Sequence, residues 1–318
     1  MSFLQAEKRR QTEWKLKTRS LSRQAKKPGL FGNRLFPFCL PVDYAHENLF
    51  ADTRERIIEY FLSHDITWHT AALPGSPSNH LCSSQVFLAN FLGPFQYDGD
   101  GLHSLLQPAF PDLLEVQPIE SHDQYLAFEW VPPVDLLGEL PKGHRTLTRG
   151  MGNTSIDFTV LGRFETGTVE LILGEAKYTE HYPTRLVEPI VASKRLSRYT
   201  DVLNRVPWVP DVDDEHARQL ATEPVFQVFR HHLLAMTLKE TFPSIDNVRI
   251  LHLYVDRGRS APQESSPVLQ SHPGMRILQD SPIPFSEISA QRLLAGIALE
   301  ARGDLAHWVE YMRERYRL

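Results

Sequence analysis

Apolar and polar residues follow two different periods along this chain of 318 residues. The helical period predicts three helices, at residues 52–62, 81–92 and 223–240. The second of these is apolar nearly all round, so we expect it to be buried. The strand period predicts four strands, at residues 125–131, 155–164, 169–178 and 248–255. The order helix, three strands, helix, strand predicts an α/β fold of the α+β type, with a central mixed β-sheet flanked by helices.

The segments outside this core predict extra helices at both ends of the chain. The first 27 residues lack proline and glycine, which is compatible with a helix as far as Pro28. Proline-rich stretches at residues 207–224 and 256–284 predict loops, and amphipathic helices are expected from there to residue 317, interrupted near Gly303. We therefore expect three parts, which are a basic N-terminal arm (1–34), a core (35–255) and a loop with C-terminal helices packed on that core (256–318).

Composition is that of a globular protein, with 42% apolar and 23% charged residues. No apolar run reaches the ~20 residues that cross a bilayer, and no apolar segment follows the first methionine. We therefore expect neither a membrane partner nor a secretory signal. Cys39 and Cys82 are the only cysteines, which excludes a disulfide framework and a cysteine-rich zinc site. A reducing, cytoplasmic setting is the simplest expectation.

The charge is distributed unevenly along the chain. Residues 1–34 hold ten Lys or Arg against Glu7 and Glu13, which gives +8. The net charge of −5 therefore leaves −13 on the remaining 284 residues. A basic arm on an acidic body suits a polyanionic partner such as nucleic acid, because neutralised phosphates release counterions. The alternative is a solvated terminus with no partner.

The predicted hairpin carries the main candidate chemistry. Glu175 and Lys177 lie two residues apart on its second strand and must share one face. A two-residue turn would put Asp157 of the first strand on the opposite face, whereas a three-residue turn at 165–167 puts it directly opposite Glu175. Gly167 favours the longer turn, which takes a glycine in the left-handed conformation. The sequence thus predicts that all three charged groups converge.

Two directly opposed carboxylates repel each other, and a divalent cation between them removes that penalty. Mg²⁺ prefers oxygen ligands, so Asp157, Glu175 and the carbonyl of Ala176 form a candidate metal site. Lys177 would orient or help to deprotonate an attacking water and offset charge in the transition state. The alternative is an ordinary solvent-facing strand, since the same acid-x-lysine spacing recurs at residues 13–15.

With this set of residues the chain resembles the PD-(D/E)XK nuclease superfamily, the fold of many restriction endonucleases. Asp157 matches its first acid, Glu175 its second acid and Lys177 its lysine, and the element order matches the superfamily's core. Residues 66–69, 79–85, 174–180 and 226–231 are similar to a bacterial branch of restriction-endonuclease-like proteins. The resemblance covers roughly residues 50–255. It implies a restriction-type endonuclease that uses Mg²⁺ or Mn²⁺, with double-stranded DNA as the expected substrate.

The chain also departs from that pattern. Ile156 stands where many members have proline, and the helix at 81–92 lacks the glutamate that many members place near the metal. Gln85 on that helix, or Glu129 on the preceding strand, could take the place of the missing acid, or each could be structural. On the later helix, further candidates share one face, and the arginine there could hold a phosphate or lie on a plain helix surface. These candidates are Gln227 and Arg230, and His231 shares their face, which the resemblance places beside the hairpin. Adjacent His231 and His232 point too far apart on a helix to bind one metal together.

Two other function classes stay open. One is a non-catalytic nucleic-acid-binding protein that keeps a degenerate nuclease fold, and the other is a structural protein with a surface ion-pair network. The assembly is also open, and a homodimer is one option. No glycine-rich phosphate loop, HExxH motif or Gly-x-Ser-x-Gly elbow is present, which removes support for NTPase, metalloprotease and α/β-hydrolase functions. His69 and His80, in loops before the buried helix, are expected to be structural.

Overall fold

The structure is a computed structural model, and the residues that it describes are 2–70, 73–140, 143–144, 146–180, 185–206, 208, 213–256, 269, 272–298 and 302–318. The α-helices are α1 (Phe3–Lys17), α2 (Arg54–Ser63), α3 (Ser84–Leu92), α4 (Gly99–Leu106), α5 (Pro189–Ser197), α6 (Thr200–Leu203), α7 (Asp214–Leu220), α8 (Val225–Thr241), α9 (Ala290–Ala298) and α10 (Asp304–Tyr316). Short 3₁₀ helices are η1 (Val42–Asn48), η2 (Gly93–Phe95) and η4 (Pro273–Leu278). The strands are β1 (Gly29–Phe31), β2 (Arg34–Phe36), β3 (Leu113–Gln117), β4 (Ala127–Trp130), β5 (Ile156–Phe164), β6 (Val169–Lys177), β7 (Asn247–Tyr254) and β8 (Phe285–Ser289).

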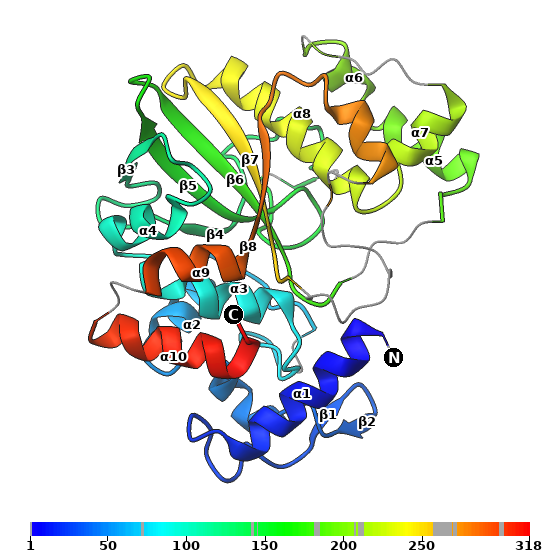
Figure 1. Cartoon of the computed structure of the whole chain (residues 1–318). Helices are drawn as coiled ribbons and strands as arrows, with labels where there is room; N and C mark the ends of the chain where they lie inside the picture. Colours follow the sequence, from blue (N-terminus) through cyan, green and yellow to red (C-terminus); the bar gives the residue numbers. More distant parts are fainter. Residues whose placement is uncertain are drawn as a thin grey trace.

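A six-stranded mixed sheet forms the centre of the molecule (Figure 1). Its strands run in the order β3-β5-β6-β7-β8, and β4 also pairs with β5. The pairs of β5 with β3, β4 and β6 are antiparallel, whereas β6–β7 and β7–β8 are parallel. The prediction of a central mixed sheet flanked by helices is confirmed.

Helices cover both faces of this sheet, because alternate residues of its strands are apolar on each face. Leu171 and Leu173 of β6 belong to a core cluster with α8. Phe158 and Ile172 belong to the second cluster, on the face that carries α3, α4 and α9. Figure 1 shows α8 with α5, α6 and α7 on one side, and α1, α2 and α10 beyond the other.

Most of the predicted elements are present with shifted ends. The predicted helices correspond to α2, α3 and α8, and the predicted strands to β4, β5, β6 and β7. The first helix ends at Lys17, ten residues before the predicted end, and the chain then turns around the buried Leu21 and Ala25. Periodicity did not predict α4, α5, α6 and β3, nor α7 and η4 inside the predicted loops. The predicted C-terminal helix was wrong over residues 285–289, which form β8. These short elements depend on pairing and packing with distant segments, which local periodicity does not encode.

The division into arm, core and C-terminal part stays a prediction. One buried cluster contains residues of all three, among them Trp14, Phe128 and Trp308.

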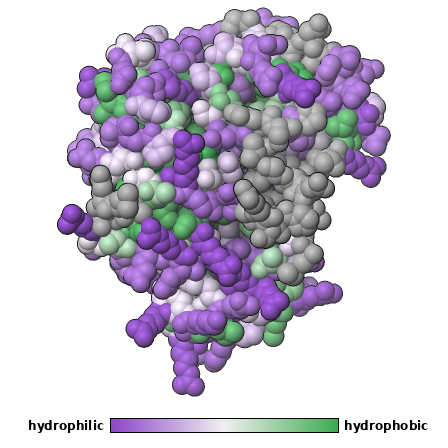
Figure 2. Space-filling model, in the orientation of Figure 1, coloured by the Kyte–Doolittle hydropathy of each residue, from purple (hydrophilic) through white to green (hydrophobic). Residues whose placement is uncertain are grey.

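Hydrophilic side chains cover most of the face drawn in Figure 2, and its hydrophobic patches are small and separate. Among the described residues, no helix combines the length and apolar character needed to cross a membrane.

Candidate active site

The turn of the β5–β6 hairpin has the predicted geometry. The Phe164 amide donates to the Thr168 carbonyl at 3.0 Å, and the Gly167 amide donates to the Phe164 carbonyl at 2.8 Å. Gly167 has φ +82°, in the left-handed region. Phe158 pairs with Gly174, and the same register places the next pair, Asp157 and Glu175, opposite each other. The predicted three-residue turn and its register are confirmed.

This register belongs to a row of ionisable residues that crosses five strands. On one side of Asp157, the β4–β5 register places Glu129 opposite it. On the other side, Glu175 pairs with His252 of β7, and His252 pairs with Glu287 of β8. Since β6 and β7 are parallel, these residues come from positions far apart in the chain. The sheet thus collects three carboxylates and a histidine–glutamate pair at one level.

Glu175 lies at the centre of the row and its charge is only partly compensated. Its side chain is 2% exposed and forms an ion pair with Lys177 on the same face. Neither carboxylate oxygen has a hydrogen-bond donor of acceptable geometry among the described residues. A buried carboxylate with unfilled oxygens is suited to a cation, because an unpaired buried charge is costly.

The set of donors fits a hard divalent cation. Asp157 and Glu175 supply carboxylate oxygens, which Mg²⁺ prefers. The amide of Ala176 donates to Asp157 Oδ2 at 2.8 Å and holds that carboxylate in place. Within the described part of the chain, no group of three or more His, Cys, Asp or Glu side chains is arranged to hold a metal. The expected set is smaller, with two carboxylates and one backbone carbonyl.

The two candidates for the missing acid form one hydrogen-bonded unit. Gln85 Nε2 of α3 donates to Glu129 Oε1 at 2.7 Å, and Ser155 Oγ donates to Glu129 Oε2 at 3.2 Å. Glu129 is 5% exposed and has φ +48°, a conformation that is uncommon for residues other than glycine. Backbone strain of this kind often accompanies functional sites. A carboxylate therefore occupies the region near Asp157, although α3 has none.

His69 also belongs to this unit, although the sequence analysis expected a structural histidine. Its backbone amide donates to Gln85 Oε1 at 2.7 Å, and its Nε2 lies 3.4 Å from Glu129 Oε1. The hydrogen bond and charge of Glu129 raise the pKa of His69, against the opposing effect of burial. Its side chain is 53% exposed, so it stands at the edge of the site towards solvent.

Burial and the neighbouring carboxylates change the pKa of Asp157. Burial raises the pKa of Asp157 well above its usual range, and the charges of Glu175 and Glu129 add to that rise. Lys177 and the amide of Ala176 act in the opposite direction. A cation bound beside Asp157 would offset the neighbouring acids and favour the ionised carboxylate.

The face of α8 beside the hairpin contributes a third side chain, that of His231. His231 is fully buried, and its Nε2 lies 3.7 Å from Glu175 Oε2. Burial lowers the pKa of His231 well below its usual value, so the ring is neutral. The expectation that this face of α8 lies beside the hairpin is confirmed for His231. Its spacing from Gln227 and Arg230 already placed it on their face of the helix, but no role at the metal site was assigned to it.

The other two candidates on α8, Arg230 and Gln227, do not contact Asp157, Glu175 or Lys177 through hydrogen bonds or ion pairs. Arg230 Nη1 donates to Thr154 Oγ1 at 3.1 Å and lies 4.0 Å from Glu139 Oε1. Gln227 is half-buried and makes no hydrogen bond with other described residues through its side chain. Arg230 thus borders the start of β5, whereas Gln227 contacts none of the candidate catalytic groups through a polar bond.

The sequence was compared with models of known protein families, with curated proteins and with solved structures. The family model described as "Restriction Endonuclease associating with ARP" matches residues 8–317. The chain belongs to this family. No curated protein and no solved structure matches it. The match includes all of α2 to α10 and most of α1.

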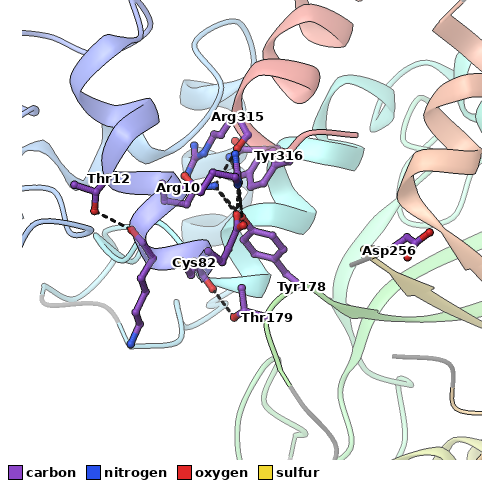
Figure 3. Close-up of polar contacts among 12 residues, drawn as sticks. Arg10, Thr12, Cys82, Tyr178, Thr179, Asp256, Arg315 and Tyr316 are labelled. Carbon is purple, nitrogen blue, oxygen red and sulfur yellow. Dashed lines mark hydrogen bonds and ion pairs between the residues drawn. The ribbon is translucent and has the colours of Figure 1, made fainter. Parts of the chain in front are cut away.

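In this member of the family, α1 is docked on the end of β6. Tyr178, which directly follows Lys177, receives a hydrogen bond from Gln11 Nε2 at 2.8 Å and one from Arg10 at 3.2 Å. Its hydroxyl in turn donates to Glu7. Figure 3 shows Arg10 and Tyr178 pointing toward each other beside Tyr316 of α10. Helix α1 thus holds the chain directly after Lys177.

The basic N-terminal segment therefore serves more than one purpose. Two of its cations are used inside the fold, because Arg10 pairs with Glu7 and Lys15 Nζ donates to the carbonyl oxygens of Lys27 and Cys39, each at 3.0 Å. Other cations of the segment remain exposed on the surface, where a polyanion could reach them, although Arg9 pairs with Glu13 at 3.2 Å. The exposed ones are Arg9, Lys17, Arg19, Arg23, Lys27 and Arg34.

Proposed function

We propose that the protein is a metal-dependent nuclease of the PD-(D/E)XK type that hydrolyses phosphodiester bonds in DNA. The observation that carries this proposal is the register that sets Asp157 opposite Glu175, with Lys177 on the same face of β6. Membership of a restriction endonuclease family supports a nucleic-acid substrate. Six exposed cations in residues 1–34 support a polyanionic substrate as well.

Asp157, Glu175 and the Ala176 carbonyl would hold Mg²⁺ or Mn²⁺. The bound cation would lower the pKa of a water and offset the negative charge of the phosphate. The partly unfilled oxygens of Glu175 support this role, as does the crowding of carboxylates that raises the pKa of Asp157. Glu129, held by Gln85 and Ser155, would orient a water on the other side of Asp157.

Lys177 would act as a cation rather than as a base. Burial alone would lower the pKa of Lys177, but the carboxylates of Glu175, Asp157 and Glu180 outweigh it and raise the pKa. A lysine that stays protonated can orient the attacking water and stabilise charge on the phosphate in the transition state. A protonated lysine donates hydrogen bonds, and it cannot take a proton from the attacking water.

Cleavage assays test this proposal. Supercoiled plasmid, linear duplex and single strands are incubated with Mg²⁺, Mn²⁺ or EDTA. We expect cleavage only with metal, and a loss of about 10²–10³-fold in rate for Lys177→Ala and Glu175→Gln. Glu165→Gln, at an exposed position in the turn of the same hairpin, is the matched control and should keep wild-type activity. Cleavage that survives in EDTA, or in both site variants, contradicts the proposal.

A non-catalytic nucleic-acid-binding protein is the second candidate. The absence of an acid from α3 favours it, since metal binding then depends on fewer side chains. Duplex binding without cleavage in any metal, unchanged by Glu175→Gln, would support this candidate over the nuclease.

A further inference from the structure

A pocket of about 630 Å³ lies between α5 and α8, on the side of the sheet that carries α8. Four cations and two aromatic rings contribute to its lining. They are Lys194, Arg195, Arg198, Tyr199, Phe226 and Arg230. None of the described residues that line it is acidic. The net positive charge of this lining favours an anionic ligand.

Neutral groups hold the arginines in position. Arg195 Nη1 donates to the Ala221 carbonyl at 2.6 Å, and Arg198 Nη2 donates to the Glu139 carbonyl at 3.1 Å. These bonds fix the guanidinium groups without removing their charge. The side chain of Lys194 is exposed, and its ammonium group makes no hydrogen bond or ion pair with other described residues.

Arg230 is the innermost cation of the pocket. Its Nε is buried and has no hydrogen-bond partner among the described residues. The nearest carboxylate, Glu139, lies 4.0 Å from Nη1 and already accepts bonds from Thr154 Oγ1 at 2.9 Å and Tyr199 at 2.6 Å. Arg230 therefore keeps donor capacity for a ligand oxygen.

Apolar surface lies next to these charges. The guanidinium groups of Arg195 and Arg230 lie 5.1 and 5.3 Å from the ring centroid of Phe226. Ile190 and Val191 at the start of α5 are 78% and 37% exposed, although both are apolar. A ligand that combines phosphates with apolar sugar and base surfaces would cover both kinds of group.

One helix, α8, contributes to both the pocket and the candidate active site. Arg230 bonds Thr154, which precedes Asp157 by three residues, and the next residue on α8, His231, lies against Glu175. Three residues of extended chain span at most about 10 Å. That length equals roughly three nucleotide steps at about 3.4 Å each.

We propose that the pocket between α5 and α8 binds the phosphodiester backbone of DNA a few nucleotides away from the bond that is cleaved. This inference rests on the proposed function for its placement of the cleaved bond. Arg230 and Arg198 contact phosphate oxygens, Lys194 adds charge at the outer edge, and the apolar start of α5 lies along the sugars. An acidic protein is the alternative occupant, and the short distance along α8 and Thr154 to Asp157 and Glu175 favours DNA.

Binding to fluorescein-labelled duplex DNA in EDTA tests the pocket without cleavage. The full-length Lys194→Ala/Arg198→Ala variant loses two phosphate contacts, so the slope of log affinity against log salt should fall by about 1.8. At 0.15 M salt this corresponds to a loss of about 30-fold in affinity. The matched control is Lys239→Ala/Arg163→Ala, which removes the same charge at exposed positions near the turn end of the sheet. It should bind with wild-type affinity.

Loss of the hydrogen bond from Arg198 to the Glu139 carbonyl could by itself disturb the fold of the double variant. A second variant that leaves Arg198 in place controls for this. Lys194→Glu changes one exposed side chain and should weaken binding at least as much as Lys194→Ala. Wild-type affinity and salt slope in both pocket variants would overturn the inference, even if the wild type cleaves DNA in Mg²⁺, and would leave an acidic protein as the occupant. Weaker binding in the pocket variants supports the inference even if the wild type proves unable to cleave, in which case only the proposed function fails.

Discussion

Replacement of Asp157 by asparagine should stabilise the metal-free protein. The register puts Asp157 between Glu175 and Glu129, with Lys177 as the nearest compensating charge. Directly opposed side chains lie about 5 Å apart, and an effective dielectric constant of about 20 gives roughly 3 kcal/mol for each charge pair. Two repulsions and one attraction leave a net cost of about 3 kcal/mol. Asparagine removes this cost and keeps an oxygen for the Ala176 amide, although that bond becomes weaker by about 1 kcal/mol.

We therefore expect Asp157→Asn to raise the free energy of unfolding by about 1–2 kcal/mol, or the Tm by about 2–4 °C. The assay is thermal unfolding in EDTA across a pH series. Because the pKa of Asp157 is raised in the folded state, the wild type loses stability as the pH rises from about 4 through that raised pKa. The gain should thus be absent near pH 4 and largest at alkaline pH. Added Mg²⁺ should raise the Tm of the wild type more than that of the variant.

One result would refute this reasoning. If Asp157→Asn is less stable than the wild type at pH 8 in EDTA, the carboxylates do not repel each other as the register implies. Glu165→Gln removes a charge from the exposed turn of the same hairpin and should leave the Tm unchanged.

Three further predictions concern the frame around the site. Gly167→Ala should destabilise the protein by about 1–2 kcal/mol in urea unfolding, since alanine is strained at φ +82°, whereas Gly167→Asn should cost less. Tyr178→Phe leaves buried partners on α1 unpaired and should cost about 1–3 kcal/mol, and an equal loss in the control Tyr97→Phe, at a 39% exposed position, would contradict this. Burial lowers the pKa of Lys15 to about 8, so the wild type should gain stability between pH 8 and about 10.4, and Lys15→Met should lack that gain in a pH series of urea titrations.

The exposed cations of residues 1–34 need charge variants rather than deletion. Helix α1 buries Trp14 and contacts Tyr178, so its removal would unfold part of the structure together with any binding surface. Substitution of exposed positions such as Arg19 and Arg23 by alanine changes the charge alone. A smaller salt dependence of duplex binding would then show that these residues contact phosphates.

The sequence by itself determined the hairpin and the residues on it. The positive φ of Gly167 is a local property, and strand alternation then places Asp157, Glu175 and Lys177 on one face. The order of the main helices and strands was also predictable, because each has its own periodicity.

Only the tertiary structure decided what surrounds that hairpin. The pairing of Glu129 with Gln85 joins α3 to β4, and the row through His252 and Glu287 depends on parallel registers that no local turn sets. His231 reaches Glu175 because the packing of α8 fixes the rotation of that helix on the sheet. Contacts between segments so distant in the chain are selected by burial and shape of the whole core, and a one-dimensional pattern carries no record of them.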